Sequence, residues 1–404
     1  MENTFITYEK ALSILEQHKG VFPIEIRNLE NCIGAYLAED LIADRDFPPF
    51  DRVTMDGVAI AYDTFKNGKR EFKIEATAAA GTSQKTLQDP LNCIEVMTGA
   101  IMPYKVDTVI RYEDLEIMDG KATILLGKLQ HKQNVHFEGV DISEGTIIMP
   151  KGNRLSSAEI NIAAAVGKAS LKVKKMPKAV IFSTGDELVP VHETPKLHQI
   201  RRSNIHGIQS TLKEWGISAD LQHLPDDKDK MEKIISSLLE SYDLFIFTGG
   251  VSKGKFDYLP DVLESLNITK HFHKIQQRPG KPFWFGTNSA GKKIFALPGN
   301  PVSSFVCVYV YLQFWLKKSL GVTETQLYVK LKTDVRFNPK LVYFLEAKLE
   351  SKMDGTLVAN PIKGNGSGDF ANLVKTDGFL VLPQNKSEFK KGEVYPFVSY
   401  RSIF

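Results

Sequence analysis

The sequence predicts a multidomain α/β protein: a central, doubly wound parallel sheet domain, an inserted β domain, a helical and extended N-terminal domain and a C-terminal β domain. Its 404 residues exceed the length of one ordinary domain. Apolar runs separated by helical periods fill the middle of the chain, and β-forming residues with turns dominate on both sides. We expect the domains to be bounded as 1–46 with 142–176, 47–141, 177–321 and 322–404.

The N-terminal domain is predicted from helical segments on both sides of a β-rich stretch. A periodic segment over residues 8–18 predicts one helix, and residues 35–43 predict a second. Ser156 is the predicted N-cap of a later helix that Gly167 ends. Because this helix can pack back on the first segment, residues 47–141 are expected to form an insertion. The insertion carries short β runs at 57–60, 72–74, 93–97 and 109–112.

The central domain is expected to begin after a lysine-rich linker at residues 174–178. Strands are predicted at 179–182, 217–221, 244–247 and 294–297. Helices are predicted at 203–215, 229–240, 261–266 and 302–320. Continuous apolar strands separated by helices indicate a parallel sheet that is covered on both faces.

The composition excludes several classes of protein. A net charge of +3 is too small for a general nucleic-acid binder. Cys32, Cys93 and Cys307 lie far apart, which favours a reducing compartment over a disulfide framework. The N-terminus lacks the regions of a signal peptide, and the apolar stretch at 302–316 is too short for a membrane span. We therefore expect a cytoplasmic protein with no nucleic-acid and no membrane partner.

Four loop motifs carry the chemistry. They span residues 184–187, 248–258, 278–282 and 297–304. Three of them directly follow an apolar run, and ligands of open parallel sheets bind beyond the carboxyl ends of the strands. Their glycines, carboxylates, hydroxyls and cations suit a phosphorylated ligand held together with a metal ion.

The first motif combines a flexible backbone with two acidic side chains. Thr184 precedes Gly185, which lets a ligand approach the backbone closely. Asp186 and Glu187 are adjacent carboxylates, suited to Mg²⁺ or to a polar ring of a ligand. The alternative is that these two residues only cap a helix.

The second motif predicts an anion site. Gly249, Gly250 and Ser252 can form a backbone nest, and Asp257 could hold a cation that bridges to the anion. The alternative is an ordinary glycine-rich turn.

The last two motifs add cations and a helix start. Asn300 followed by proline predicts an N-cap, where free N–H groups with Ser303 could bind an oxyanion or phosphate. A helix start alone would leave Pro298 and the glycine after it unexplained. Arg278 and Lys281 flank a Pro-Gly pair and can point into one cleft, although lone charges are more often solvated.

Weaker signals lie elsewhere. Asp56 and Thr98 each precede a glycine in the inserted domain, and we interpret both places as simple turns. The nine histidines show no metal-ligand spacing. His271 and His273 alternate on a predicted strand, where a surface position is favoured over a ligand role.

In their order along the chain, these motifs resemble those of one family. The motifs are Phe-Pro-Pro-Phe at 47–50 with Met-Asp-Gly at 55–57, Met-Thr-Gly-Ala at 97–100, the stretches 182–188 and 248–258, Pro-Gly-Lys-Pro at 279–282 and Leu-Pro-Gly-Asn-Pro-Val-Ser at 297–303. Nearly the whole chain is similar to the molybdopterin molybdenumtransferases (MoeA), which are related to the gephyrin E domain. The ordered set is far more specific than any one motif.

The resemblance implies an elongated homodimer of four-domain subunits with a MogA-like central sheet domain that binds the pterin. The site is implied to lie where that domain faces the first two domains of the partner subunit. The implied reaction takes adenylylated molybdopterin and molybdate with Mg²⁺, inserts the metal at the dithiolene and releases AMP. The molybdopterin adenylyltransferase and the enzymes that accept the cofactor are the implied protein partners.

The resemblance also implies roles for individual residues. The implied catalytic residues are Asp56, Thr98, Asp141, Glu187, Asp257 and Lys281. Those implied to bind the pterin substrate are Thr184, Gly185, Asp227, Gly249, Gly250, Ser252, Arg278, Pro298, Asn300 and Ser303. Asp186, Glu187 and Asp257 are the implied metal ligands, Asp226 competes with Asp227 for its role, and Lys281 and Ser303 resemble the residues on the molybdate side.

The chain departs from the family pattern at several anion-binding positions. Val140 stands where glutamate is common, His136 where arginine is usual, and Lys253 where valine is usual. The arginine pattern of the last domain is altered around Lys340 and Leu345. These departures leave open an alternative, a non-catalytic molybdopterin-binding carrier or scaffold. A nucleotide pyrophosphatase built on the same sheet domain is a weaker reading, because it explains neither outer β domain. Molybdate and tungstate are not distinguished.

Overall fold

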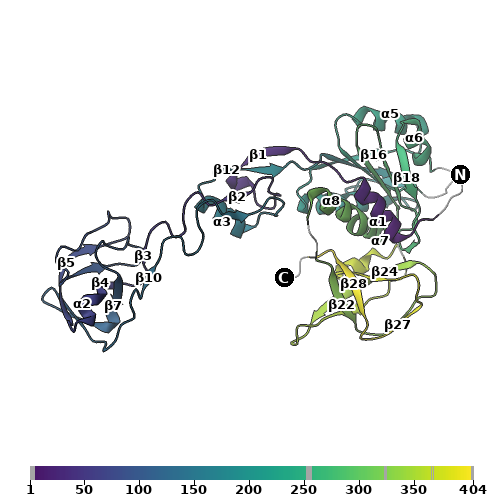
Figure 1. The fold of residues 1–404 in the computed structure, drawn as a ribbon. Helices are drawn as coiled ribbons and strands as arrows, with labels where there is room; N and C mark the ends of the chain where they lie inside the picture. The colour runs from purple at the N-terminus through teal and green to yellow at the C-terminus, as the bar shows by residue number, and fades with distance from the viewer. Residues whose placement is uncertain (1–4, 252–256, 323–324, 365, 367, 402–404) are drawn as a thin grey trace. The chain divides into compact units, whose positions relative to one another are not determined.

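A computed structural model describes residues 5–251, 257–322, 325–364, 366 and 368–401. The chain forms two compact units (Figure 1). The first unit comprises Met1–Ile26, Gly34–Ala38 and Lys172–Phe404, and the second comprises Arg27–Ile33 and Glu39–Leu171. The division into four domains with the bounds given above stays a prediction.

The first unit is built on a six-stranded sheet. Its strands, in spatial order, are β16 (Ala219–Leu224), β13 (Ala179–Thr184), β17 (Leu244–Thr248), β21 (Lys293–Leu297), β20 (Trp284–Thr287) and β18 (Thr269–His273). All neighbours pair in parallel except β20, which is antiparallel to both β21 and β18. The predicted parallel sheet is therefore confirmed, with one reversed strand that the sequence reading did not anticipate.

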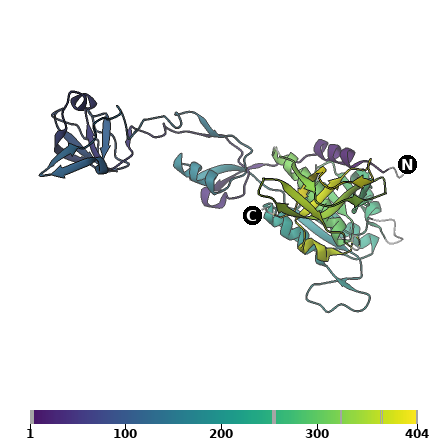
Figure 2. The same cartoon turned by 90° about the horizontal axis from the view of Figure 1, so that it is seen from below.

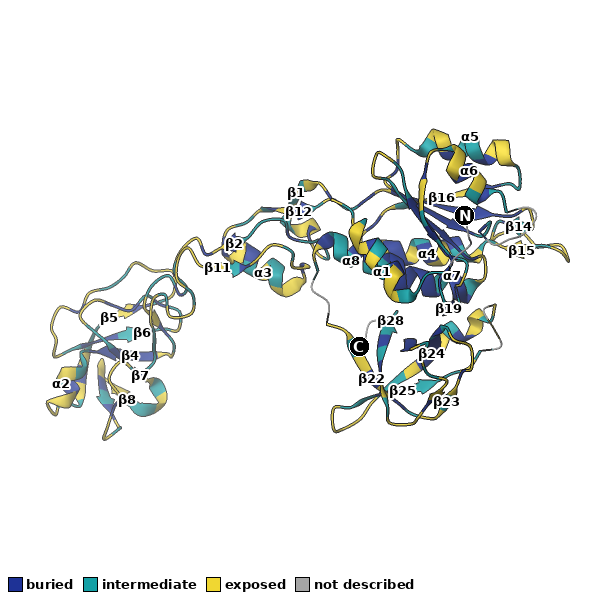
Figure 3. Cartoon of the chain, turned by 45° about the vertical axis from the view of Figure 1, so that its right-hand side comes forward, coloured by how far each residue is buried: buried dark blue, intermediate teal, exposed yellow. Residues whose placement is uncertain are grey.

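Both faces of this sheet are covered by helices, because its central strands β13, β17 and β21 are largely apolar and point buried side chains to both sides. In β13, Ala179 and Ile181 join the core on one face, and Val180 and Phe182 join the core on the other. The first core includes helices α1 (Tyr8–Gln17), α4 (Ser203–Glu214), α7 (Pro301–Cys307) and α8 (Gln313–Leu320). The second includes α5 (Lys228–Leu238) and α6 (Leu259–Ser265), which lie together above the sheet in Figure 1. Figure 3 shows the central strands as a buried layer.

The helix predicted over 302–320 is confirmed as one continuous helical run. A π-helical turn, Val308–Leu312, joins α7 to α8. Trp315 packs in the core and its Nε1 donates a hydrogen bond to the His18 carbonyl at 3.1 Å, which ties α8 to the end of α1. In the described part of the chain, no helix has the length and apolar character that a membrane span needs.

The C-terminal β domain closes on itself. Five strands pair in a ring: β24 (Val342–Ser351), β25 (Leu357–Pro361), β22 (Leu327–Leu331), β28 (Val394–Ser399) and β26 (Gly378–Leu382), with β26 returning to β24. A short strand of the central domain, β19 (Gln277–Arg278), pairs in parallel with β24. This pairing fixes the C-terminal domain against the central one (Figures 1 and 2) and places Arg278 at their junction.

The second unit contains the predicted small β domain. Its sheet is ordered β7 (Thr108–Arg111), β4 (Gly57–Ile60), β6 (Cys93–Val96), β5 (Glu71–Ala78), β9 (Lys121–Ile124) and β8 (Leu115–Met118). The β runs predicted at 57–60 and 72–74 fall on β4 and β5, and those predicted at 93–97 and 109–112 fall on β6 and β7 except for their last residues. The predicted later helix is confirmed as α3 (Ser157–Ala165), with a capping box between Ser156 and Glu159.

The helix predicted over residues 35–43 is wrong. The segment instead contains the two-residue strand β2 (Leu41–Ile42), which pairs with β11 (Ile147–Met149). Leu37 makes an isolated bridge to Val173, so the backbone of this segment is hydrogen-bonded to distant residues. Tertiary pairing therefore overrides the local helical pattern.

Candidate functional site

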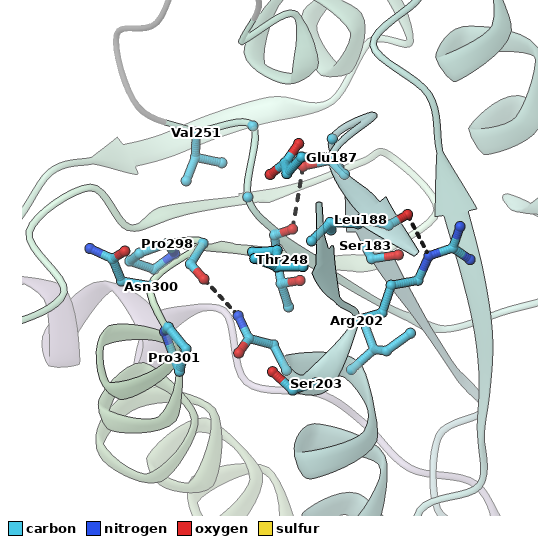
Figure 4. A pocket seen from close by; sticks show the side chains of 18 of the residues that line it. Ser183, Glu187, Leu188, Arg202, Ser203, Thr248, Val251, Pro298, Asn300 and Pro301 are labelled. Carbon is cyan, nitrogen blue, oxygen red and sulfur yellow. Dashed lines mark hydrogen bonds between the residues drawn. The ribbon is translucent and has the colours of Figure 1, made fainter. Parts of the chain in front are cut away.

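A cavity of about 630 Å³ lies beyond the carboxyl ends of β13, β17 and β21 (Figure 4). The chain leaves β13 toward β16 on one side and later returns to β17 on the other, so the order of strands reverses beside β13. Open α/β sheets bind their ligands at such switch points. The cavity wall includes predicted site residues from the first, second and fourth loop motifs: Thr184, Gly185, Glu187, Gly249, Gly250, Asp257, Pro298 and Asn300. Ser252, also predicted for this site, lies outside the described residues.

Glycine is required where the first two motifs meet. Gly249 has a φ of +95°, and a Cβ built on it would lie 2.6 Å from the Thr184 Oγ1. That hydroxyl donates to the Thr248 carbonyl at 3.3 Å, so the ends of β13 and β17 are in direct contact. The Gly249 N–H donates to the Leu297 carbonyl at 3.0 Å, which joins the third strand end to the pair. The loop is therefore more than an ordinary turn, because it holds three strand ends together beneath the cavity.

Two aspartates form a reciprocal pair at the rim. The Asp226 N–H donates to Asp186 Oδ1 at 3.2 Å, and the Asp186 N–H donates to Asp226 Oδ2 at 3.3 Å. Asp226 lines the cavity beside Glu187 and Asp257. The alternative in which Asp186 and Glu187 cap a helix is wrong, because the turn leads into the short strand β14 (Leu188–Val189).

The neighbouring Asp227 caps a helix instead of lining the cavity. It is the N-cap of α5, its Oδ1 accepts from the Lys230 N–H at 3.1 Å, and its carboxylate pairs with the Lys230 ammonium. The hydrogen bonds from Lys230 hold the pKa of Asp227 below its usual value. Of the two competing residues, Asp226 therefore faces the cavity and Asp227 begins a helix.

These carboxylates fit Mg²⁺ only in company with a ligand. Among the described residues, no group of three or more His, Cys, Asp and Glu side chains is close enough to hold a metal. Mg²⁺ commonly takes one or two carboxylates and completes its shell with substrate phosphates and water. Asp226 and Glu187, which both line the cavity, are candidates for that partial set.

The fourth motif forms the opposite wall. Asn300 is the N-cap of α7 and Pro301 occupies its first turn, as predicted. The Asn204 Nδ2 donates to the Gly299 carbonyl at 2.7 Å, which fixes the loop (Figure 4). Arg202, whose Nε donates to the Leu188 carbonyl at 3.3 Å, also lines the cavity. The sequence analysis did not predict Arg202 and Asn204 as site residues. Two adjacent arginines before a predicted helix were the signal that could have found them.

A second cavity of about 620 Å³ adjoins the first and shares Pro282, Pro298 and Asn300 with it. Arg278, Lys281 and Ser303 line it, so the two cations do face one cleft, as expected. Gly280 makes the loop possible, because a Cβ there would lie 2.7 Å from the Gln277 Nε2 and 2.9 Å from the Cys307 sulfur.

Strand β24 supplies the far wall of this second cavity, including Tyr343, Leu345 and Glu346, and Lys363 lines it as well. The sequence reading named Leu345 only as a departure and missed Glu346 and Lys363. A glutamate flanked by apolar residues was the signal that could have found Glu346.

In the second unit, the structure brings Asp56 and Thr98 together. The Thr98 N–H and Oγ1 donate to Asp56 Oδ1 at 2.6 and 2.8 Å. Thr98 lies in a turn with Gly99, as interpreted, but Asp56 does not: Gly57 is the first residue of the buried strand β4.

Asp141 lies apart from this pair and contacts the ring of His136, whose Nε2 is 3.0 Å from Asp141 Oδ1. The Arg52 Nη2 lies 3.3 Å from the other ring nitrogen of His136.

The histidines of β18 are half-buried, which corrects the expected surface position. The His271 ring stacks on His18 with centroids 3.7 Å apart. The His273 Nε2 lies 2.7 Å from the Val251 carbonyl, and burial lowers the pKa of this imidazole. A neutral His273 donating to that carbonyl supports the backbone at the edge of the first cavity.

Removal of the Thr98 hydroxyl is expected to raise the pKa of Asp56. The Thr98 N–H and then its hydroxyl hold that pKa below its ordinary value, so Thr98→Val removes the second cause and keeps the first. A carboxyl group whose pKa is lower in the folded than in the unfolded protein stabilises the fold at pH values above its unfolded-state pKa. This stabilisation is lost as the pH falls through the folded-state pKa. The variant should therefore lose less stability than the parent on acidification. Carbon-13 NMR titration of Asp56 measures the shift, and Thr77→Val, which removes a hydroxyl bonded to Glu95, is the matched control.

Comparison with known families matches three stretches that together cover most of the chain. Residues 6–167 match the MoeA N-terminal region (domain I and II), residues 180–318 a probable molybdopterin binding domain, and residues 328–399 the MoeA C-terminal region (domain IV). The fold is accordingly the MoeA-like multidomain α/β fold, with a MogA-like central sheet domain and a C-terminal β domain.

Whole-length relatives agree. The chain is 40% identical to the molybdopterin molybdenumtransferase of Synechocystis sp. over 398 residues, covering 98% of this chain and 100% of the relative. It is 30% identical to that of Staphylococcus epidermidis, covering 97% and 95%. The crystal structure of a MoeA protein of molybdopterin biosynthesis from Pyrococcus horikoshii OT3 superposes with a TM-score of 0.84 at 25% identity, covering 98% and 100%. The chain belongs to the molybdopterin molybdenumtransferase (MoeA) family.

Proposed function

We propose that this protein catalyses the Mg²⁺-dependent insertion of molybdate into adenylylated molybdopterin, with release of AMP. The observation that carries the proposal is the pair of adjoining cavities that share Pro282, Pro298 and Asn300. One is edged by carboxylates and glycine-rich loops, and the other by Arg278 and Lys281. A long phosphorylated ligand in the first cavity and an oxyanion in the second would meet at the shared wall.

The charges suit that chemistry. The pterin substrate is a polyanion and molybdate is an oxyanion, so their approach needs cations that offset the repulsion. Arg278 and Lys281 supply fixed positive charge, and Ser303 supplies a hydroxyl at the same cavity. In the reaction, molybdenum becomes bound to the dithiolene sulfurs, and the phosphoanhydride bond is broken so that AMP leaves. Mg²⁺ held by one or two of the carboxylates Asp186, Asp226, Glu187 and Asp257, together with the substrate phosphates, would polarise that phosphoanhydride.

Further proposals come from the family resemblance. We propose a homodimer in which Asp56, Thr98 and Asp141 act from the partner subunit, and the molybdopterin adenylyltransferase and cofactor-accepting enzymes as protein partners. We also infer a cytoplasmic location. Cys32, Cys93 and Cys307 are all buried and form no disulfide among the described residues, which suits a reducing compartment.

The test is AMP release from adenylylated molybdopterin by the purified protein with Mg²⁺, with and without molybdate. Molybdate-dependent release is expected. Pterin binding without release would instead support the carrier or scaffold, which the replacement of an arginine by His136 favours. Tungstate in place of molybdate tests the choice of metal in the same assay.

Mg²⁺ is expected to bind weakly to the protein alone and about tenfold or more tightly with the adenylylated substrate present, because phosphates must complete its shell. Isothermal titration of Mg²⁺ with and without the substrate measures the difference. Asp226→Asn should weaken the binding with substrate present, whereas Asp227→Asn should leave it unchanged, since Asp227 caps α5. Equal effects of the two substitutions would contradict the assignment of Asp226.

A further inference from the structure

The second cavity contains a carboxyl group that the proposed function does not use. Glu346 lies on β24 and lines the cavity together with Arg278, Lys281 and Lys363. Its side chain is buried, with 7% of the residue exposed, and its Oε1 has no hydrogen-bond partner among the described residues. A buried carboxylate without a partner is costly, so the residue needs an explanation.

The surroundings of Glu346 favour its neutral form. A Cβ built on Gly364 would lie 3.2 Å from Glu346 Oε2 and 3.5 Å from Asp369 Oδ2, so the two carboxyl groups converge on this glycine. The amide of Asn372 reaches the same point, at 3.0 Å from that Cβ. Burial first, and the charge of Asp369 second, raise the pKa of Glu346 to about 7.

The other charged side chains that line this cavity are cations. They are the guanidinium group of Arg278 and the ammonium groups of Lys281 and Lys363. The phenols of Tyr343 and Tyr400 interact electrostatically with Glu346, and burial raises the pKa of each above its usual value. Glu346 is therefore a carboxyl group whose pKa its buried position moves into the neutral range.

We propose that the second cavity binds its oxyanion together with a proton, which Glu346 carries. An ionised Glu346 repels an anion in the cavity, whereas a protonated Glu346 removes that charge and offers an O–H donor to it. Glu346 thus makes oxyanion affinity depend on pH, and it favours ligands that accept a hydrogen bond. The inference rests on the proposed function in one respect, namely that the oxyanion of this cavity is molybdate.

Anion binding and protonation of Glu346 should favour each other. An anion beside Glu346 raises its pKa further, so binding takes up a proton above the pKa of the free protein. Affinity is then constant well below about pH 7 and falls by up to about tenfold per pH unit above it. Molybdate and sulfate are suitable probes, because both stay dianions through this range and do not titrate themselves.

The experiment is calorimetric titration of the full-length protein with molybdate, and with sulfate, between about pH 6 and about pH 8.5 in buffers of different ionisation enthalpy. The parent should bind more weakly as the pH rises, with proton uptake. Glu346→Gln keeps the shape of the side chain and should bind without pH dependence and more tightly than the parent above pH 7. Asp369→Asn should move the pH midpoint downward, because it removes the charge that opposes ionisation of Glu346.

Glu350→Gln is the matched control, since Glu350 lies on the same strand but pairs with Lys332 and does not line the cavity. Its titration should match that of the parent. A Glu346→Gln variant that keeps the pH dependence, or a parent that binds neither anion at about pH 6, would overturn the inference. AMP release, assayed separately, decides the proposed function: release without proton-linked binding removes this inference alone, and proton-linked binding without release removes only the transferase.

Discussion

Glu187→Gln is expected to lower the rate of AMP release by on the order of 100-fold or more while leaving the fold intact, because even indirect partners of a metal ligand contribute about 10- to 100-fold. Glu187 follows Gly185, whose φ is +123°. A Cβ on that glycine would lie 2.3 Å from Glu187 Oε2, so the carboxylate folds back over the backbone at the cavity wall. The substitution removes its charge and keeps its volume.

Single-turnover AMP release with saturating Mg²⁺ and molybdate measures this effect. Glu193→Gln, in the exposed loop between β14 and β15 (Ile200–Arg201), is the control, since Glu193 is solvated and does not line the cavity (Figure 3). Turnover of Glu187→Gln within a few-fold of the parent would remove Glu187 from the site. An unchanged unfolding profile for both variants shows that the loss is chemical.

The middle of the sheet and its loops could be predicted because β13, β17 and β21 are largely apolar runs and three of the four motifs directly follow one. Such strands have a single stable placement, in the middle of a covered sheet. The carboxyl ends must then meet at one edge, which explains why Thr184, Gly249 and Pro298 come together in the cavity as the sequence suggested. Strand β20 was missed, although the turn over residues 288–291, in which the Gly291 N–H donates to the Asn288 carbonyl, separates it from β21.

The remaining errors share a physical cause: the deciding contacts are distant in sequence. The segment at 35–43 has a helical pattern, but its backbone pairs with residues more than a hundred positions away. The sequence alone does not tell which of the adjacent residues Asp226 and Asp227 lines the cavity. The position at which α5 begins decides this, because it makes Asp227 the N-cap. Glu346 belongs to the site because β19 pairs with β24, a contact that no local motif encodes.

Gly57→Ala is expected to destabilise the β domain by at least about 3 kcal/mol, at the upper end of what overpacking a well-packed site usually costs. A Cβ on Gly57 would lie 1.8 Å from the Ile110 carbonyl oxygen and 2.8 Å from the Arg111 Cα. Both atoms belong to the backbone of β7, which pairs directly with β4, so no side-chain rotation can make room. The two strands must separate.

Hydrogen exchange followed by mass spectrometry tests this locally. Amides of β4, β6 and β7 should exchange faster in Gly57→Ala, while those of β13 and β17 keep their parental rates. Gly127→Ala is the control in the same domain, because a Cβ there meets no atom within 4 Å. Unchanged exchange in β4 would show that the strands absorb the methyl group, contrary to the geometry.

The same substitution separates the position of Asp56 from its chemistry. The Asp56 carbonyl accepts from the Tyr112 N–H at 3.0 Å, so moving β7 also moves the residue that holds Thr98. Asp56→Asn keeps that backbone and removes only the charge. If Asp56 acts as proposed, both variants lose AMP release, but only Gly57→Ala also loosens β4. If Asp56→Asn keeps full activity, the glycine after it is retained for the packing of β4 against β7, and the Met-Asp-Gly motif is structural.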